Sequence, residues 1–204
     1  MGYFPFFIDI SKKPCLIVGG GTVALRKAEK LLPFGPEIRV VAPKICKALR
    51  EMDLVFEERP FEDRDLQGAF MVIAATDDSE VNGRIYRLCT RDGILVNSVD
   101  DMENCGFIFP ALVKKDSLTV GISTSGTAPA AAKLMRKRIE ELLDDRFLRA
   151  AELYALCRGE LKERFNGEDE LANAADRLLK FCIESKKNPT KEMAEEFIRE
   201  LVKK

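Results

Sequence analysis

Short apolar runs rich in β-branched residues alternate with amphipathic stretches up to about residue 123. The runs have the length of strands in a buried sheet, and the stretches between them place apolar residues at helical spacing. Strands that alternate with helices are typical of βαβ units and a mostly parallel sheet. The expected strands are 15–18, 38–41, 55–58, 71–75, 94–97, 106–109 and 118–123, and the clearest helices between them are 23–32, 45–51 and 81–90.

The pattern changes after the last expected strand. From residue 128 onward only the helical spacing continues, over 128–143, 147–165, 168–185 and 190–202. The chain is therefore expected to be an α/β protein, with a Rossmann-type, mostly parallel sheet followed by a helical C-terminal part.

Composition excludes several classes of protein. The chain has 204 residues, 46% of them hydrophobic, with a formal net charge of −1, which favours a folded protein over a disordered one. It has no histidine, which excludes a Ser-His-Asp triad, a Cys-His pair and an imidazole zinc site. Acid–base chemistry then falls to carboxylates, lysine, tyrosine or cysteine. The near-zero net charge disfavours a general nucleic-acid binder.

The sequence also favours a cytoplasmic protein. No apolar run reaches the roughly 18–20 residues that a membrane-spanning helix needs. The apolar N-terminus lacks the basic region and small-residue cleavage site of a signal peptide. Six scattered cysteines without a C-x-x-C pair are typical of reduced thiols. They are Cys15, Cys46, Cys89, Cys105, Cys157 and Cys182.

A glycine-rich turn follows the first expected strand. Gly19, Gly21 and Ala24 occupy the three small positions of the G-x-G-x-x-A dinucleotide fingerprint. The first permits a tight turn, the second lets a pyrophosphate approach the backbone, and the third allows close helix–strand packing. The opening turn of the helix also offers free N–H groups to phosphates. We interpret the motif as a dinucleotide site, with a purely structural glycine turn as the alternative.

The acid that commonly binds the adenosine ribose is missing. It would stand at the end of the second strand, about 20 residues after the glycines. The sequence there reads Ala42-Pro43-Lys44. Backbone groups around Pro43 are left to contact the ribose, and Lys44 is compatible with a 2′-phosphate. The residues therefore leave the choice between NAD and NADP open.

Acidic residues follow two later strands, where ligands lie in doubly wound sheets. Asp77 and Asp78 come after the strand 71–75, and their favoured role is to cap the helix 81–90. Asp100 has no obvious helix to cap. It is the candidate general base, with Asp101 as the competing choice.

A hydroxyl- and glycine-rich loop, 123–129, stands between the last strand and a helix. It can cap that helix or bind a carboxylate at the helix N-terminus. Residues 104–139 hold six basic residues against one acid, Asp116, which indicates either a solvated face or a site for a multiply anionic ligand. The basic residues are Lys114, Lys115, Lys133, Arg136, Lys137 and Arg138.

Taken together, these motifs resemble the siroheme synthase N-terminal family. The segments 15–28, 74–78, 97–100 and 123–129, preceded by 4–9, follow the family's order and spacing over about residues 3–143. Members are precorrin-2 dehydrogenases, and some are also sirohydrochlorin ferrochelatases. They are homodimers with a helical C-terminal part. The resemblance implies three regions: an NAD-binding Rossmann domain 1–103, a small α/β dimerisation and substrate-binding segment 104–143, and an all-helical domain 144–204.

The resemblance implies NAD-dependent oxidation of precorrin-2 to sirohydrochlorin, with Fe²⁺ insertion as a second step in some members. Asp100 matches the family's essential aspartate, which would accept a proton in both steps. No metal-binding residues of the protein are expected, and the eight substrate carboxylates give the basic segment a purpose. The implied cofactor residues are Gly19, Gly20, Gly21, Thr22, Val23, Pro43, Lys44, Thr76 and Asn97, and the implied substrate residues are Ser123, Thr124, Ser125, Lys133, Arg136 and Lys137.

Two other interpretations stay open. A different NAD(P)-dependent oxidoreductase of a small acid would explain the glycine turn but not the basic third segment. A non-enzymatic NAD-sensing Rossmann module would not need Asp100. One departure from the family concerns regulation, because Thr124 stands where a bifunctional branch has a serine that can be phosphorylated.

Overall fold

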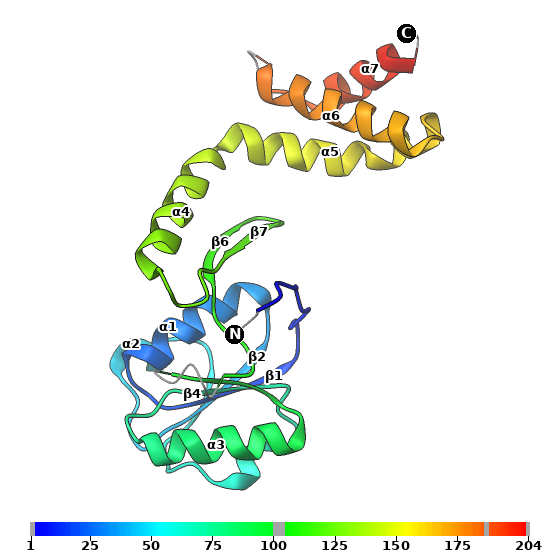
Figure 1. The fold of residues 1–204 in the computed structure, drawn as a ribbon. Helices are drawn as coiled ribbons and strands as arrows, with labels where there is room; N and C mark the ends of the chain where they lie inside the picture. The colour runs from blue at the N-terminus through cyan, green and yellow to red at the C-terminus, as the bar shows by residue number, and fades with distance from the viewer. Residues whose placement is uncertain (1–2, 100–104, 186–187, 203–204) are drawn as a thin grey trace. The chain divides into compact units, whose positions relative to one another are not determined.

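The chain divides into two compact units, residues 1–110 and 111–204, in the computed structural model (Figure 1). The structure describes residues 3–99, 105–185 and 188–202. The first unit carries the glycine turn, and the second carries the hydroxyl-rich loop and the basic helix.

A five-stranded, entirely parallel sheet forms the centre of the first unit, in the order β3-β2-β1-β4-β5. Both faces of a parallel sheet are covered by helices, which is why its strands read as continuous apolar runs. All four residues of β4 are buried. The expected α/β class and Rossmann-type sheet are thus confirmed. The strands are β1 (Pro14–Val18), β2 (Glu37–Val41), β3 (Val55–Glu57), β4 (Met71–Ala74) and β5 (Leu95–Ser98).

Helices cover both faces of this sheet (Figure 1). Alternate strand residues feed two separate apolar cores, one containing Ile17 and Ile73 and the other containing Val18 and Val72. The chain order reverses between β1 and β4, and at such a switch point the connections diverge to leave a crevice. The helical elements are α1 (Thr22–Leu31), α2 (Lys47–Arg50), α3 (Ser79–Asp92) and the short 3₁₀ segments η1 (Leu32–Phe34) and η2 (Asp63–Leu66).

The expected strand 106–109 is wrong. Beside β5 this segment forms no ladder: the Gly106 N–H donates to the Val96 carbonyl at 2.9 Å, and the Phe107 carbonyl accepts from the Asn97 side chain at 3.0 Å. One isolated bridge, from Cys105 to Asn97, precedes it. Its aromatic residues, Phe107 and Phe109, pack onto the α1-side core instead. Tertiary packing of these rings therefore explains the apolar run that the sequence pattern assigned to a strand.

An antiparallel hairpin opens the second unit. It consists of β6 (Ala111–Lys115), which the sequence pattern missed, and β7 (Leu118–Ile122). The turn between them places Asp116 in the left-handed region, at φ 48°. Helix α4 (Pro129–Leu142) packs against the hairpin. Lys115 joins the two, because its ammonium donates to the carbonyls of Glu140 (3.0 Å) and Leu143 (2.5 Å) where α4 ends.

Three further helices pack around one apolar core. They are α5 (Asp145–Arg164), α6 (Glu168–Glu184) and α7 (Lys191–Val202). Leu153, Leu178 and Ile198 contribute one fully buried side chain from each helix. Helix α5 begins two residues earlier than the pattern indicates, because Asp144 accepts a bond from the Phe147 N–H and caps it.

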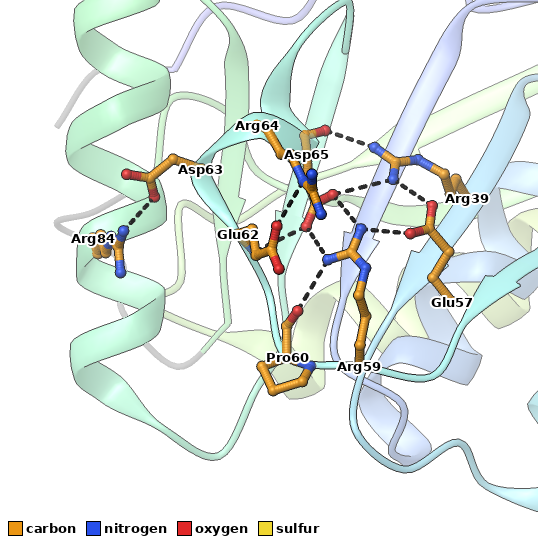
Figure 2. Close-up of polar contacts among 9 residues, drawn as sticks. All are labelled: Arg39, Glu57, Arg59, Pro60, Glu62, Asp63, Arg64, Asp65 and Arg84. Atoms are coloured by element: carbon orange, nitrogen blue, oxygen red, sulfur yellow. Dashed lines mark hydrogen bonds and ion pairs between the residues drawn. The ribbon is translucent and has the colours of Figure 1, made fainter.

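A buried carboxylate ties the β3 side of the sheet together (Figure 2). Asp65, 3% exposed, accepts from Arg59 at 2.6 and 2.8 Å and from Arg39 at 3.4 Å. Glu57 on β3 pairs with both arginines. Hydrogen bonds from the Arg59 guanidinium and from the backbone N–H of Glu62 lower the pKa of Asp65 to about 2, although burial by itself would raise it. Because its partners favour the charged form, the cluster stabilises the fold only while Asp65 is ionised.

We expect Asp65→Asn to lower the free energy of unfolding by roughly 2 kcal/mol at neutral pH. The Asp65 contribution is fully present above about pH 4, the unfolded pKa, and is lost as the pH falls through the folded value near 2. Urea unfolding of both proteins between pH 2 and 7 would measure it. Glu58→Gln, which breaks the exposed pair with Arg50, is the matched control and should change little. An equal effect of both substitutions would contradict the assignment.

Candidate functional site

The glycine turn lies at the carboxyl end of β1, against the end of β4. Gly19 has φ +125°, and a Cβ there would lie 2.2 Å from the Ala75 carbonyl oxygen. A Cβ on Gly20 would lie 2.0 Å from the Lys44 carbonyl oxygen. Both clashes are with backbone, which cannot rotate away as a side chain can. These two glycines therefore serve the packing of three strand ends at one point.

Gly21 differs from its two neighbours. A Cβ there would meet nothing within 4 Å, and φ is an ordinary −86°. Packing therefore does not require glycine at this position, and the residue is exposed. Open space in front of a fingerprint glycine fits the close approach of a pyrophosphate.

Helix α1 begins at this open space. Gly21 is its N-cap, and no side chain in the described part of the chain caps it. The first turn, which starts at Thr22 and Val23, holds no acid. Its backbone N–H groups and the positive end of the helix dipole are suited to bind phosphate. The turn and the helix start together form a cradle that fits a dinucleotide pyrophosphate.

The turn after β2 borders the same place. Pro43 and Lys44 are exposed, and the Cys46 N–H donates to the Gly20 carbonyl at 2.8 Å. Residues 42–46 contain no acidic side chain. The side chain of Lys44 is thus the charged group that this turn presents.

Thr76, at the end of β4, is held by a buried amide. Asn82, 8% exposed, accepts from the Thr76 N–H (3.2 Å) and hydroxyl (2.8 Å) and donates to its carbonyl (3.0 Å). Asp78 caps α3 by accepting from the Glu80 and Val81 N–H groups, so the expected capping role is confirmed for Asp78, whereas Asp77 precedes the N-cap. Sequence reasoning missed the function of Asn82, whose signal was an amide just inside a helix after a polar turn.

Asn97, at the end of β5, is also buried and fully engaged. Its Oδ1 accepts from the Lys27 ammonium at 2.9 Å, and its Nδ2 donates to the Phe107 carbonyl at 3.0 Å. Cys105 Sγ lies 3.4 Å from Nδ2 and donates to the Ser98 carbonyl at 3.1 Å. Asp100 and Asp101, the candidate bases, lie outside the described residues.

The hydroxyl-rich loop of the second unit is organised by its own bonds. The Ser123 hydroxyl accepts from the Ser125 N–H at 3.0 Å, and the Thr124 hydroxyl accepts from the Ala128 N–H at 3.2 Å. Ser125 has φ 51°, a left-handed conformation. Thr124 thus binds the N–H of Ala128, the residue before α4, but no side chain of the described residues caps the helix, so the expected capping role is wrong. The Ser123 and Ser125 side chains are exposed.

The basic residues of β6 and α4 include some that are exposed and some that are paired within the protein. Lys133 and Lys137 are exposed and four residues apart, so they lie on neighbouring turns of one face. Arg136 is half-buried and pairs with Glu140, and Lys115 binds carbonyls at the end of α4. Only part of the basic segment is therefore available to a ligand.

Two cysteines of the first unit, Cys15 and Cys89, are poorly suited to acid–base work. Burial raises the pKa of the Cys15 and Cys89 thiols to about 11, so both stay protonated at neutral pH. All six cysteines lie in the described part of the chain, and none of them is in a disulfide. Within the described ranges, no three histidine, cysteine or acidic side chains form a group that could hold a metal ion. No helix of residues 3–99, 105–185 or 188–202 is long and apolar enough to span a membrane.

Comparison with known proteins identifies the family. A model described as "Putative NAD(P)-binding" matches residues 6–111, just over half of the chain. The chain belongs to this NAD(P)-binding family. A second model, "Sirohaem biosynthesis protein central", matches residues 115–142. The resemblance to the siroheme synthase N-terminal family is therefore confirmed.

Curated relatives agree with the two family models. Siroheme synthase of Nitrosococcus oceani is 37% identical over 171 residues, and siroheme synthase 1 of Serratia proteamaculans is 38% identical over 174. These matches cover 82% and 83% of this chain but only 36% and 37% of the relatives. A solved structure, "SirC, precorrin-2 dehydrogenase", covers 99% of this chain with a TM-score of 0.71 at 24% identity, and so it shares the fold.

The three glycines are expected to respond differently to alanine. Gly21→Ala should leave the thermal midpoint unchanged and weaken NAD⁺ binding by at least about tenfold, because its methyl group would occupy the open space. Gly19→Ala and Gly20→Ala should unfold more easily, because their methyl groups clash with backbone. Calorimetric titration and thermal unfolding would measure both quantities. Gly159→Ala in α5, where a Cβ also meets nothing, is the control and should not alter binding.

Proposed function

We propose that this protein oxidises precorrin-2 to sirohydrochlorin, with NAD⁺ as the hydride acceptor, in siroheme biosynthesis. The observation that carries the proposal is the cradle at the β1–β4 switch point, where Gly21 faces open space before the uncapped start of α1. The siroheme synthase relatives, over four-fifths of this chain, support the substrate class.

The cofactor-binding role of the first unit is proposed residue by residue. The pyrophosphate would be bound by the N–H groups that follow Gly21, and the ribose by the exposed Pro43–Lys44 turn. Thr76, held by its hydrogen bonds with Asn82, lies two residues after β4, the strand next to β1. A dinucleotide that extends over the strand ends would then reach the end of β5, where Asn97 lies.

The reaction needs a proton acceptor as well as a hydride acceptor. Bound NAD⁺ supplies the electrophilic ring carbon that accepts the hydride. The substrate C–H bond breaks with both electrons leaving as hydride, while a second hydrogen leaves as a proton. We propose the Asp100 carboxylate as the base that accepts this proton.

A substrate with eight carboxylates also needs cationic partners. On α4 we propose three residues as partners of the substrate carboxylates. They are Lys133 and Lys137, which are exposed, and Arg136, which also forms a salt bridge with Glu140. The Ser123, Thr124 and Ser125 loop would add hydroxyl donors at the start of the same helix. The rival oxidoreductase of a small acid would have no use for so many cations.

An anaerobic assay of the wild type and Asp100→Asn tests the proposal. Precorrin-2 is supplied with NAD⁺ or NADP⁺, and NADH absorbance and the sirohydrochlorin spectrum are followed. We expect turnover by the wild type and a loss of at least about a hundredfold in kcat in Asp100→Asn, with NAD⁺ affinity unchanged.

The other outcomes separate the rival functions. NAD⁺ binding without NADH formation by the wild type would favour the sensing module and contradict the enzyme. Full activity of Asp100→Asn would show that another residue is the base, and Asp101→Asn would then be the next variant to assay. Addition of Fe²⁺ after oxidation tests iron insertion as a second step, through an iron-dependent change in the spectrum.

We also propose that the protein is a homodimer formed through the second unit. Leu134, Met135 and Leu142 on α4 are 51%, 45% and 73% exposed. Met135 and Leu142 are seven residues apart, which places them on one face of the helix. An apolar face of this kind on a surface helix is stabilised when another surface covers it.

Substitution on that face should separate the subunits. We expect Met135→Glu with Leu142→Glu to shift the protein from dimer to monomer, because burying two carboxylates in an interface is costly. Sedimentation velocity would measure the mass. Leu156→Glu, at a 55% exposed position on α5, is the matched control and should leave the mass unchanged. A wild type that sediments as a monomer at micromolar concentration would contradict the proposal.

A further inference from the structure

Helix α1 carries one lysine that reaches across to the far edge of the sheet. Lys27 is half-buried, and its ammonium lies 2.9 Å from Asn97 Oδ1 and 3.8 Å from the centre of the Phe109 ring. These partners are 70 and 82 residues away in sequence. The ammonium is attracted electrostatically by the face of the Phe109 ring, and it supplies a donor to the amide oxygen of Asn97.

Asn97 links Lys27 to the segment that contains Phe107. The residue is 5% exposed, so each polar atom of its side chain needs a partner within the protein. Lys27 supplies the donor for Oδ1, and this leaves Nδ2 turned toward the Phe107 carbonyl at 3.0 Å. Loss of the ammonium would leave a buried oxygen without that donor and remove the reason for the amide to keep this orientation.

The consequence is that one lysine fixes two stretches of chain. It holds the end of β5 through Asn97, and it holds segment 105–109 through the Phe107 carbonyl and the Phe109 ring. The Gly106 N–H bond to Val96 and the Cys105 thiol bond to Ser98 join the same two stretches. In sequence, Asp100 stands between them.

We propose that Lys27 is a positioning residue for the oxidation, which acts through Asn97 to fix the end of β5 and segment 105–109 relative to the nucleotide-binding helix. This inference rests on the proposed function, because it assigns Lys27 to the same reaction. Lys27 lies five residues after Thr22, more than one turn from the phosphate-binding start of α1. Its loss should therefore impair turnover and not nucleotide affinity.

The test compares Lys27→Met, which keeps the length of the side chain, with Lys27→Arg, which keeps a cation and donors. We expect Lys27→Met to lower kcat by at least about tenfold, with the Kd for NAD⁺ within about twofold of the wild type. Lys27→Arg should retain kcat within about threefold. Lys30→Met, at an exposed lysine in the last turn of the same helix, is the matched control and should match the wild type.

Amide hydrogen exchange adds a readout that does not depend on turnover. We expect the Gly106 N–H to exchange at least about tenfold faster in Lys27→Met than in the wild type or Lys30→Met. The exchange measurement remains informative if the wild type does not oxidise precorrin-2. That outcome would contradict the proposed function but not the anchoring role of Lys27.

Three results would overturn the inference. One is a kcat of Lys27→Met within twofold of the wild type. Another is an equal loss in Lys27→Met and Lys27→Arg, which would show that the cation and its donors are not what matters. The third is a loss of NAD⁺ affinity as large as the loss in kcat, which would make Lys27 a nucleotide contact. If Lys27→Met does not fold, Lys27→Gln provides the same comparison.

Discussion

The backbone of the glycine turn packs directly against the backbone that follows β2 and β4, and the arrangement of the first unit depends on that contact. Gly19 and Gly20 bring the end of β1 against Ala75 and Lys44 at distances that leave no room for a Cβ. Bonds from the Gly19 N–H to Val41, 3.0 Å, and from the Ala75 N–H to Val18, 2.7 Å, hold the neighbouring strand ends to it. Since three strand ends are fixed at one point, the start of α1 is also fixed, and with it the direction of its free N–H groups.

Buried amides extend this order along the carboxyl edge of the sheet. Asn82 holds the backbone of Thr76, and Asn97 holds the carbonyl of Phe107. In each case a buried amide binds a backbone carbonyl outside its own element and has a side-chain partner as well, the Thr76 hydroxyl for Asn82 and the Lys27 ammonium for Asn97. Buried polar groups that are fully paired favour a single arrangement. A ligand that binds along this edge would meet strand ends that are already in position, which lowers the conformational cost of binding.

The second unit contributes chemistry of a different kind. Its helix α4 presents lysines, an apolar face and a hydroxyl-rich start within 20 residues, while Lys115 fastens the hairpin to its end. The match of residues 115–142 to the central model of siroheme biosynthesis proteins covers these elements. The chain spans about a third of the length of the curated siroheme synthases that it matches, so the relatives carry further regions of their own.

Local sequence patterns determined the strands of the parallel sheet, the approximate positions of the helices and the place of the glycine turn, because each depends on neighbours a few residues away. The five strands of the first unit and the α3 cap at Asp78 are examples. The partners of Lys27 and Asn97 could not be derived in this way, because they are set by packing between segments up to 82 residues apart. The same limit explains segment 106–109, whose aromatic residues entered a core instead of a sheet. The sequence by itself therefore determined which residue types stand at the strand ends, and only the tertiary structure decided which of them hold one another and which face open space, since that depends on burial.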